Sequence, residues 1–118
     1  MIFDTSVLVQ RIRDRSEFQE GTISVITLIE FLRGIESEEK RKKSLALIEQ
    51  TFEIADITRE VAVSYLKLFF DLKKKGESTS DADALIAATA YTRNEEVLTM
   101  DRDFLKFEPM IKVRIQPR

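Results

Sequence analysis

The side chains of this sequence that could carry out chemistry are acidic, and they occur in four separate segments. They are Asp4, Glu30, the pair Asp81 and Asp83, and the pair Asp101 and Asp103. The chain has no His and no Cys, so it lacks the usual general base and the usual ligands of transition metals. Any catalysis must therefore use carboxylates, hydroxyls, amines or a hard metal ion.

Composition limits the kinds of protein that this chain can be. Its 118 residues, 43% of them hydrophobic, fit a single domain over 1–118 that buries roughly two-thirds of its unfolded surface. The net charge of −2 gives no overall basic field, so binding to nucleic acid would need a local patch or a metal. The most apolar stretch, 61–70, is interrupted by Lys67, and no signal-peptide pattern is present. We therefore expect a soluble, cytoplasmic protein with no membrane partner.

The acidic residues need elements to position them, and the hydrophobic pattern alternates between strands and helices. Strands are expected at residues 2–3, 22–26, 52–57, 96–99 and 112–115. Helices are expected at about 7–13, 27–33, 37–51, 59–75 and 81–93. This alternation predicts a three-layer α/β/α fold, with a central, mostly parallel sheet of about five strands flanked by helices.

Such a sheet would bring the acidic segments together. Ligands of parallel sheets bind beyond the carboxyl ends of the strands, and Asp4, Glu30 and Asp101 all follow predicted strands closely. Asp83 joins them if its helix starts at the same edge. Clustered carboxylates repel one another unless a cation binds them, and oxygen ligands suit Mg²⁺ or Mn²⁺. The pattern predicts a divalent-metal site. In it, Asp4 and Asp83 would contact the metal, Asp101 would complete its shell or hold a second ion, and Glu30 would orient the bound water or accept its proton.

Each acidic residue also has a purely structural explanation. Glu30 stands at capping-box spacing from Thr27, and Asp83 stands in the same relation to Ser80. Asp4 could cap the first helix, and the acids at 101 and 103 could be turn residues. Independent caps need not share one end of a sheet, whereas the ligands of a metal must. Convergence of the four segments is therefore what favours a site.

Four sequence segments also carry a resemblance to a known family. They are Ile-Phe-Asp-Thr-Ser-Val-Leu at 2–8, Ser-Val-Ile-Thr-Leu-Ile-Glu-Phe-Leu-Arg-Gly at 24–34, Asp-Ala-Leu-Ile-Ala-Ala at 83–88 and Leu-Thr-Met-Asp-Arg-Asp-Phe at 98–104. In order and separation they resemble the signature blocks of PIN-domain ribonucleases, and more narrowly those of the VapC toxins of toxin–antitoxin pairs. The resemblance implies a PIN-like fold and a Mg²⁺-dependent endoribonuclease that cleaves single-stranded RNA by water attack, leaving a 5′-phosphate and a 3′-hydroxyl.

The resemblance also implies roles for individual residues. The acidic quartet would be Asp4, Glu30, Asp83 and Asp101. Asp83 is chosen over Asp81 because it stands where the family's acid precedes the x-Leu-Ile-Ala-Ala segment, which leaves Asp81 as a cap or an indirect support. The supporting residues would be Asp103, a neighbouring carboxylate of variable role, and the hydroxyls of Thr5, Ser6 and Thr99 near the metal or phosphate.

Basic residues and protein partners complete the predicted site. The candidates for RNA-phosphate contacts are Arg11, Arg33, Arg93 and Arg102. The resemblance further implies a homodimer and a cognate antitoxin of the VapB type. Tyr65, Phe69 and Phe70 are expected in the core, although Tyr65 and Phe70 could instead serve a dimer.

Two other functions stay open on the sequence. Asp56 follows the third predicted strand, where the phosphoacceptor of a receiver domain would stand. Against this, Asp4 lacks an acidic neighbour and no suitable Lys follows the last strands. The second alternative is a degenerate PIN fold kept as a binding module, for which an incomplete quartet would be the sign. Here the quartet is complete.

Overall fold

The computed structural model describes residues 1–14 and 20–117. The strands are β1 (Ile2–Phe3), β2 (Thr22–Ser24), β3 (Glu53–Ala55), β4 (Val97–Thr99) and β5 (Val113–Ile115). The helices are α1 (Thr5–Asp14), α2 (Val25–Leu32), α3 (Glu38–Thr51), α4 (Arg59–Lys74), α5 (Asp81–Arg93) and the 3₁₀ helix η1 (Arg102–Phe107). The helices after β1, β2 and β3 were predicted from the hydrophobic pattern, whereas η1 after β4 was not.

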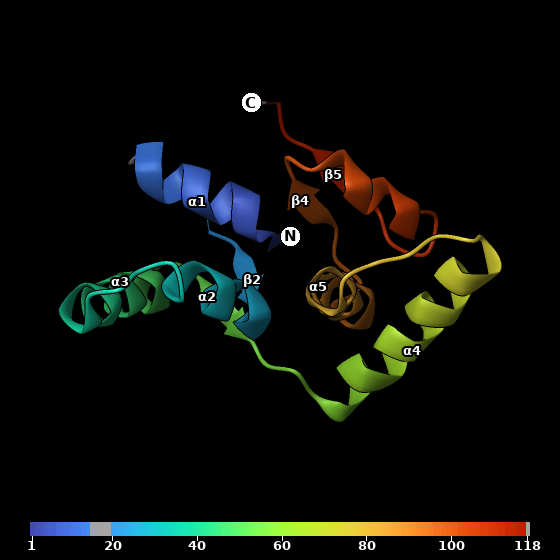
Figure 1. Cartoon of the computed structure of the whole chain (residues 1–118), viewed down its shortest axis with the longest axis horizontal. Helices are drawn as coiled ribbons and strands as arrows, with labels where there is room; N and C mark the ends of the chain where they lie inside the picture. Colours follow the sequence, from blue (N-terminus) through green and yellow to red (C-terminus); the bar gives the residue numbers. More distant parts are fainter. Residues whose placement is uncertain (15–19, 118) are drawn as a thin grey trace.

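The five strands form one sheet in the order β3-β2-β1-β4-β5, and every neighbouring pair is parallel. The chain winds outward from β1 to β3 on one side and then returns to place β4 and β5 on the other side (Figure 1). The direction of winding therefore reverses between β1 and β4, which is where ligands bind in open parallel sheets. The predicted α/β fold is confirmed, with a sheet that is wholly parallel.

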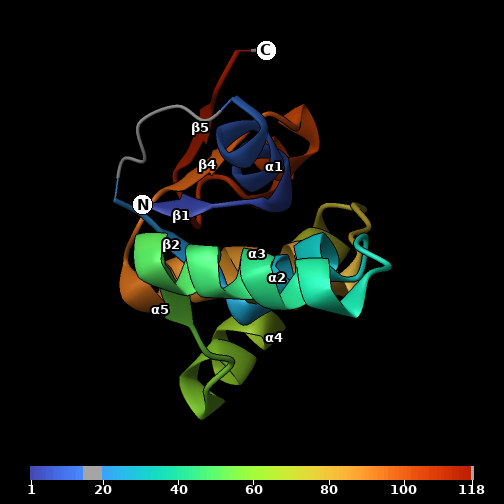
Figure 2. The same cartoon turned by 90° about the vertical axis from the view of Figure 1, so that its left-hand side faces the viewer.

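Helices cover both faces of the sheet, because successive residues of a strand point to opposite sides. Ile2 and its partner Val97 pack with α4, α5 and η1, whereas Phe3 and its partner Leu98 pack against α1 and α3. In Figure 2, α3 lies nearest the viewer and α5 lies behind it, on the other side of the sheet. Two hydrophobic cores thus fix the sheet, and its carboxyl edge stays between the helix layers.

The predicted boundary between β2 and α2 is wrong. The strand ends at Ser24, two residues earlier than expected, and Ser24 caps α2 by accepting a hydrogen bond from the backbone N–H of Ile26 at 3.1 Å. Thr27 is therefore inside the helix and buried, and its hydroxyl has no hydrogen-bond partner within 1–14 and 20–117. The capping box expected for Thr27 and Glu30 does not form, and Glu30 lies in the second turn of α2.

Helix α5 begins as predicted. The Ser80 hydroxyl accepts a hydrogen bond from the backbone N–H of Asp83 at 3.2 Å, which caps the helix. The alanines at 84, 87, 88 and 90 are buried, so that this helix packs closely between the sheet and α4. Before it, α4 ends at Lys74, and Gly76 follows the cap residue Lys75 with a φ of +72°, the left-handed conformation that suits glycine. The loop after Gly76 delivers the first turn of α5 to the carboxyl edge of the sheet.

The outer face of α4 is more apolar than expected for a solvent-exposed helix. Phe69 and Phe70 were predicted to be core residues, but they are 38% and 52% exposed, and Val63 and Leu66 of the same helix are each 51% exposed. Leu8, in contrast, is fully buried. No helix among the described residues has the length and apolar character needed to cross a membrane.

Candidate active site at the carboxyl edge of the sheet

Asp4 lies at the centre of the site, between the end of β1 and the start of α1. Its side chain is buried, and its Oδ1 atom accepts hydrogen bonds from the Ser6 hydroxyl at 2.7 Å and from the backbone N–H of Val7 at 3.1 Å. The Oδ2 atom accepts a hydrogen bond from the Thr99 hydroxyl at 2.5 Å. Asp4 therefore caps α1 with one oxygen and connects β1 to β4 with the other.

The ends of β1 and β4 are linked across the point where the winding reverses. The Thr99 hydroxyl, which donates to Asp4, accepts a hydrogen bond from the backbone N–H of Asp101 at 2.9 Å. The Ser6 hydroxyl accepts one from the backbone N–H of Met100 at 3.1 Å. Both hydroxyls were predicted as partners of the site, and the structure places both against its central carboxylate.

Glu30 reaches the same edge from α2. Its Oε1 atom accepts a hydrogen bond from the Thr5 hydroxyl at 2.7 Å, which ties α2 to the first turn of α1. Arg33 is the cap residue directly after α2, with a nitrogen 3.9 Å from the Glu30 carboxylate and 72% of its side chain exposed. Glu30 thus joins the site through side-chain contacts, and Arg33 lies at its rim.

The two aspartates of α5 have different surroundings. Asp83 is half-buried and interacts electrostatically with Glu30 and Asp101. Asp81 is exposed and accepts a hydrogen bond from the Tyr65 hydroxyl of α4 at 2.6 Å. The structure therefore brings Asp83 toward the other acids, while Asp81 is bonded to the neighbouring helix.

Burial and mutual repulsion raise the pKa of two of these acids. The pKa of Asp4 is raised from its ordinary value chiefly by burial; the hydrogen bonds from Ser6, Thr99 and Val7 oppose the shift, and the charge of Asp101 adds to it. The pKa of Asp83 is also raised chiefly by burial, with Lys106 opposing the shift. In each case a nearby positive charge would favour the ionised carboxylate.

Lys106 is a charged residue of this region that the sequence reasoning missed. Its ammonium donates hydrogen bonds to Asp103 Oδ2 at 2.7 Å and to the backbone carbonyl of Ser78 at 2.9 Å, and only 7% of its side chain is exposed. The one sequence signal is its position inside the apolar segment Phe-Leu-Lys-Phe at 104–107. Asp103 in turn donates its backbone N–H to Asp101 Oδ1 at 2.9 Å.

The predicted arginines do not all reach this edge. Arg102 is exposed at the start of η1, beside the site. Arg11 is held near the end of α1, 5.5 Å above the Phe3 ring, and donates to Gln116 Oε1 at 3.1 Å. Arg93 ends α5, about 15 Å along the helix from Asp83, and pairs there with two glutamates. The structure does not bring Arg93 together with the acidic residues.

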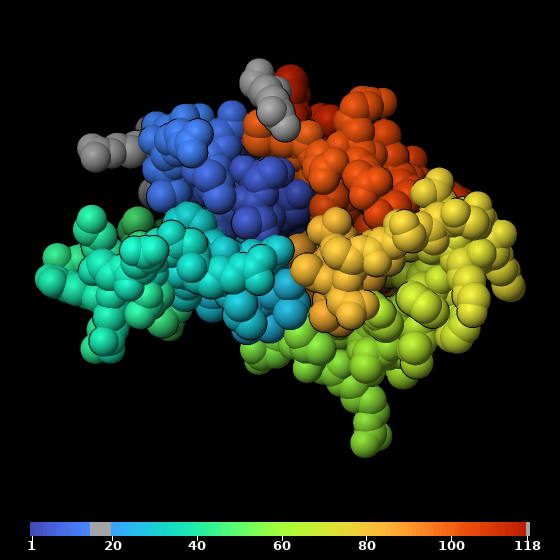
Figure 3. Space-filling model, in the orientation of Figure 1, coloured from blue at the N-terminus to red at the C-terminus, as the bar shows by residue number. Residues whose placement is uncertain are grey.

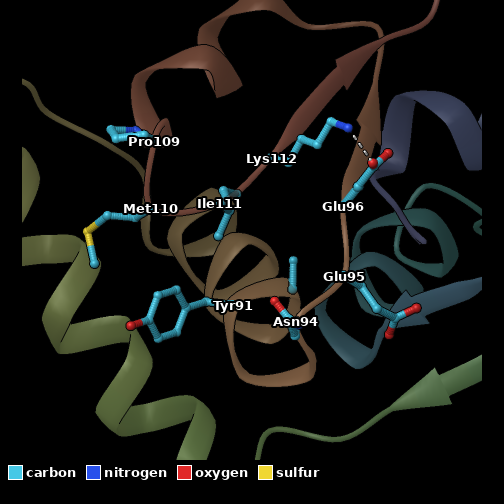
Figure 4. A pocket seen from close by; sticks show the side chains of 9 residues that line it. Tyr91, Asn94, Glu95, Glu96, Pro109, Met110, Ile111 and Lys112 are labelled. Carbon is cyan, nitrogen blue, oxygen red and sulfur yellow. Dashed lines mark ion pairs between the residues drawn. The ribbon is translucent and has the colours of Figure 1, made fainter.

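The acidic segments meet at the centre of one face of the molecule. In Figure 3 the start of α1 in dark blue, α2 in cyan, the start of α5 in gold and η1 in orange adjoin one another there. A cavity of about 460 Å³ begins at Thr5 and Ser6 and continues along α1 to Arg13. A second cavity, of about 620 Å³, lies at the far end of α5 (Figure 4). Its Glu96 is paired with Lys112 at 3.0 Å, so the carboxylate there is already neutralised.

The donor set suits a hard divalent cation. The side chains that meet here supply only carboxylate and hydroxyl oxygens, which Mg²⁺ and Mn²⁺ prefer over softer ions. Among the described residues, no three acidic side chains are gathered into a ready-made metal cluster. Mg²⁺ is commonly held by one or two carboxylates and keeps several waters, so an open arrangement of this kind fits it.

Fold and site together define an open, parallel α/β protein with an acidic site at its topological switch point. The chain belongs to the PIN domain family, whose model matches residues 1–108. It is 38% identical to ribonuclease VapC1 of Methanocaldococcus jannaschii over 86% of this chain and 76% of that protein. It is 33% identical to ribonuclease VapC1 of Rickettsia felis over 92% and 90% of the two chains. The predicted resemblance to PIN-domain proteins of the VapC type is confirmed.

Solved structures share the fold over almost the whole chain. VapBC2 from Rickettsia felis, bound to a DNA fragment from its promoter, superposes with a TM-score of 0.80 at 23% identity and covers 97% of this chain and 98% of its own. DNA-bound VapBC from Salmonella typhimurium superposes with a TM-score of 0.80 at 25% identity, over 96% and 95% of the two chains. The three-layer arrangement of helices around a parallel sheet is thus that of the VapC fold.

Proposed function

We propose that this protein is a divalent-metal-dependent endoribonuclease that cleaves single-stranded RNA in the cytoplasm, and that it is the toxin of a VapBC-type pair. The observation that supports this proposal is at the switch point between β1 and β4, where Asp4 is hydrogen-bonded to Thr99 and Glu30 to Thr5, while Asp83 interacts electrostatically with Glu30 and Asp101. The curated relatives named ribonuclease VapC support the choice of RNA as substrate.

In this proposal some residues would bind the metal ion and another would activate water. Asp4, Asp83 and Asp101 would hold a Mg²⁺ or Mn²⁺ ion, with the Thr99 hydroxyl keeping the carboxylate of Asp4 oriented. When bound, such an ion supplies positive charge against the phosphate and lowers the pKa of water. Glu30, aligned by the hydroxyl of Thr5, would orient the attacking water and accept its proton.

Attack by water on the phosphodiester would break the bond from phosphorus to the 3′-oxygen. The phosphate then stays on the 5′ end of one product, and the departing 3′-oxygen takes a proton from solvent to become a hydroxyl. The RNA backbone would be positioned by Arg33 and Arg102, which lie exposed beside the acids. The cavity that runs from Thr5 to Arg13 offers a path for the strand.

The alternative functions have less support. Asp56 follows β3, which is an edge strand, so it lies away from the switch point between β1 and β4. A receiver-like phosphoacceptor is expected at the centre of the carboxyl edge instead. A degenerate binding module would be expected to lack one of the four acids, and all four are present.

The proposal is tested by RNA cleavage with purified protein. We expect single-stranded RNA to be cut in Mg²⁺ or Mn²⁺ and to stay intact in EDTA. Asp4→Ala and Asp83→Ala should each lower the rate by at least about 100-fold, since each removes a ligand of the ion. Asp56→Asn, which removes an exposed acid elsewhere, is the matched control and should cleave at the parental rate. Parental cleavage by Asp4→Ala would exclude this site.

Two protein partners follow from the same proposal. The solved VapBC relatives contain an antitoxin with the toxin, and we propose that this chain binds a cognate VapB-type antitoxin. We also propose a homodimer formed through α4, where Val63, Leu66 and Phe70 make one exposed apolar stripe at helical spacing. Co-purification with the product of a neighbouring small reading frame tests the first partner.

A further inference from the structure

The buried ammonium of Lys106 joins two segments that are distant in sequence. It donates to the backbone carbonyl of Ser78, in the loop ahead of α5, and to Asp103 Oδ2 in η1. The side chain also lies over the buried ring of Phe107, with its nitrogen 5.6 Å from the ring centre. Lys106 is therefore held by the loop before α5, by η1 and by the hydrophobic core.

Each end of this link leads directly to a proposed metal ligand. Ser78 is two residues before Ser80, whose hydroxyl caps α5 through the backbone N–H of Asp83. On the other side, the backbone N–H of Asp103 donates to Asp101 Oδ1. Lys106 thus connects the loop before α5, the helix that carries Asp83, to the turn that carries Asp101 at the start of η1.

The link opposes a repulsion built into the site. The negative charges of Glu30 and Asp101 disfavour the ionised carboxylate of Asp83, whereas the positive charge of Lys106 favours it. Hydrogen bonds that involve a charged group are among the stronger ones in proteins, and burial strengthens them further. A buried ammonium with two such bonds is suited to holding the segments together.

We propose that Lys106 is a positioning residue that holds the first turn of α5 against η1, so that Asp83 and Asp101 are placed to share one cation. The metal part of this inference rests on the proposed function. The role proposed here is distinct from direct contact with RNA phosphate, because the ammonium is already bonded to Ser78 and Asp103 and only 7% of the side chain is exposed. Its hydrogen-bond partners lie within the fold.

The sharpest test is Lys106→Met, which keeps most of the side-chain volume beside Phe107 and removes the charge. The matched control is Lys75→Met. Lys75 also donates to a backbone carbonyl near η1, that of Glu108 at 2.9 Å, but its side chain is 38% exposed and pairs with Asp71, which is not one of the proposed ligands, at 2.9 Å. Mn²⁺ binding is measured by titration calorimetry, with Asp4→Asn as the variant whose site is disabled.

We expect Lys106→Met to raise the dissociation constant for Mn²⁺ by about tenfold, the effect of losing one charged hydrogen bond, and Lys75→Met to leave it unchanged. The direction of the change in the dissociation constant distinguishes a positioning residue from a positive charge that only repels the cation. If Lys106 acted only as a positive charge near the site, its removal would tighten Mn²⁺ binding. Unchanged or tighter binding by Lys106→Met therefore overturns the positioning role.

Hydrogen exchange of the metal-free protein gives a second test that does not depend on metal. Amides 78–84 should exchange about tenfold faster in Lys106→Met than in Lys75→Met, while those of the sheet stay alike. If Lys106→Met does not fold, Asp103→Asn, at an exposed position, should show the same local increase. Equal exchange at 78–84 refutes the inference. A parent that neither binds Mn²⁺ nor cleaves RNA refutes the proposed function instead, and the exchange result still decides the role of Lys106.

Discussion

Asp4 offers a way to separate the charge of the site from its hydrogen bonds. Its carboxylate is buried, accepts three hydrogen bonds and is disfavoured in its ionised form by burial and by Asp101. Asp4→Asn keeps an oxygen that can accept from Ser6 and Val7, but it removes the charge and the oxygen that accepts from Thr99. Asp4→Ala removes the charge and both oxygens. Both variants should lose RNA cleavage, yet they should differ in the stability of the metal-free protein.

The size of this difference follows from the contacts. In Asp4→Ala the hydroxyls of Ser6 and Thr99 and the N–H of Val7 lose their acceptor. An unmet buried hydrogen bond costs about 1–3 kcal/mol and a lost helix cap about 1 kcal/mol, partly offset by relief of the buried charge. We expect the free energy of unfolding of Asp4→Ala to fall by about 2 kcal/mol. For Asp4→Asn, relief of the buried charge opposes the loss of the acceptor of Thr99, so its free energy of unfolding should lie within about 1 kcal/mol of the parent.

The effect of pH on this comparison has a definite sign. The pKa of Asp4 is raised in the folded protein, so the folded state holds this proton more tightly than the unfolded chain does. Its contribution to stability is complete below the ordinary value of 3.8 and is lost as the pH rises through the folded pKa. Any advantage of Asp4→Asn over the parent should therefore be largest near neutral pH and shrink as the pH is lowered.

Urea unfolding in EDTA, followed by circular dichroism at several pH values, measures these differences. Near the midpoint of thermal unfolding, each 1 kcal/mol corresponds to roughly 4 °C for a domain of this size. If Asp4→Asn were destabilised as much as Asp4→Ala, the charge of Asp4 would be stabilising in the metal-free protein, and the argument from burial would fail. If Asp4→Asn cleaved RNA at the parental rate, the carboxylate would not be needed for catalysis.

Three further predictions concern other parts of the molecule. Leu66→Glu should convert a dimer to a monomer in light scattering, while Leu47→Glu, at an exposed position on α3, should not; a monomeric parent would contradict this. Arg93→Ala should lower the free energy of unfolding by about 0.5–1 kcal/mol without slowing RNA cleavage, because its ion pairs lie at the far end of α5. Gly21→Ala should cost about 1–3 kcal/mol in urea unfolding, because its added methyl would lie 2.7 Å from the Phe3 ring.

Most element boundaries could be predicted because the signals that start helices are local. Ser80 was placed at capping spacing from the sequence, and Thr58 stands directly before the helix predicted at 59–75; the hydroxyl of each accepts a hydrogen bond from the backbone N–H three residues later. The segment 22–30 was different because it offers two candidate caps, Ser24 and Thr27. Packing decides between them, since Thr27 is buried within the helix. Glu30 nevertheless reaches the site, because the length of the helix carries it to Thr5.

The parts of the site that could not be predicted depend on contacts between distant segments. Lys106 reads as a surface lysine until the loop at Ser78 is known to lie beside η1. The apolar stripe of α4 has the spacing of a buried face, and sequence cannot show that it is left uncovered. The position of Arg93, in contrast, could have been predicted from the sequence. Ten residues of helix after Asp83 place it about 15 Å away, at the opposite edge of the sheet.

The sequence alone left open whether the acids were helix caps or ligands, and the structure indicates that the two roles are compatible. Asp4 and Asp101 cap the elements that follow them through their own carboxylates, bonding to the N–H groups of Val7 and Asp103. For Asp83 the capping oxygen is supplied by Ser80. Two of the proposed ligands are thus held rigid by capping bonds, and the carboxylate of Asp83 stays available. Because Asn can cap a helix as well as Asp does, capping alone gives no reason for a charged side chain at 4 or 101, and we expect Asn at either position to keep the fold and lose cleavage.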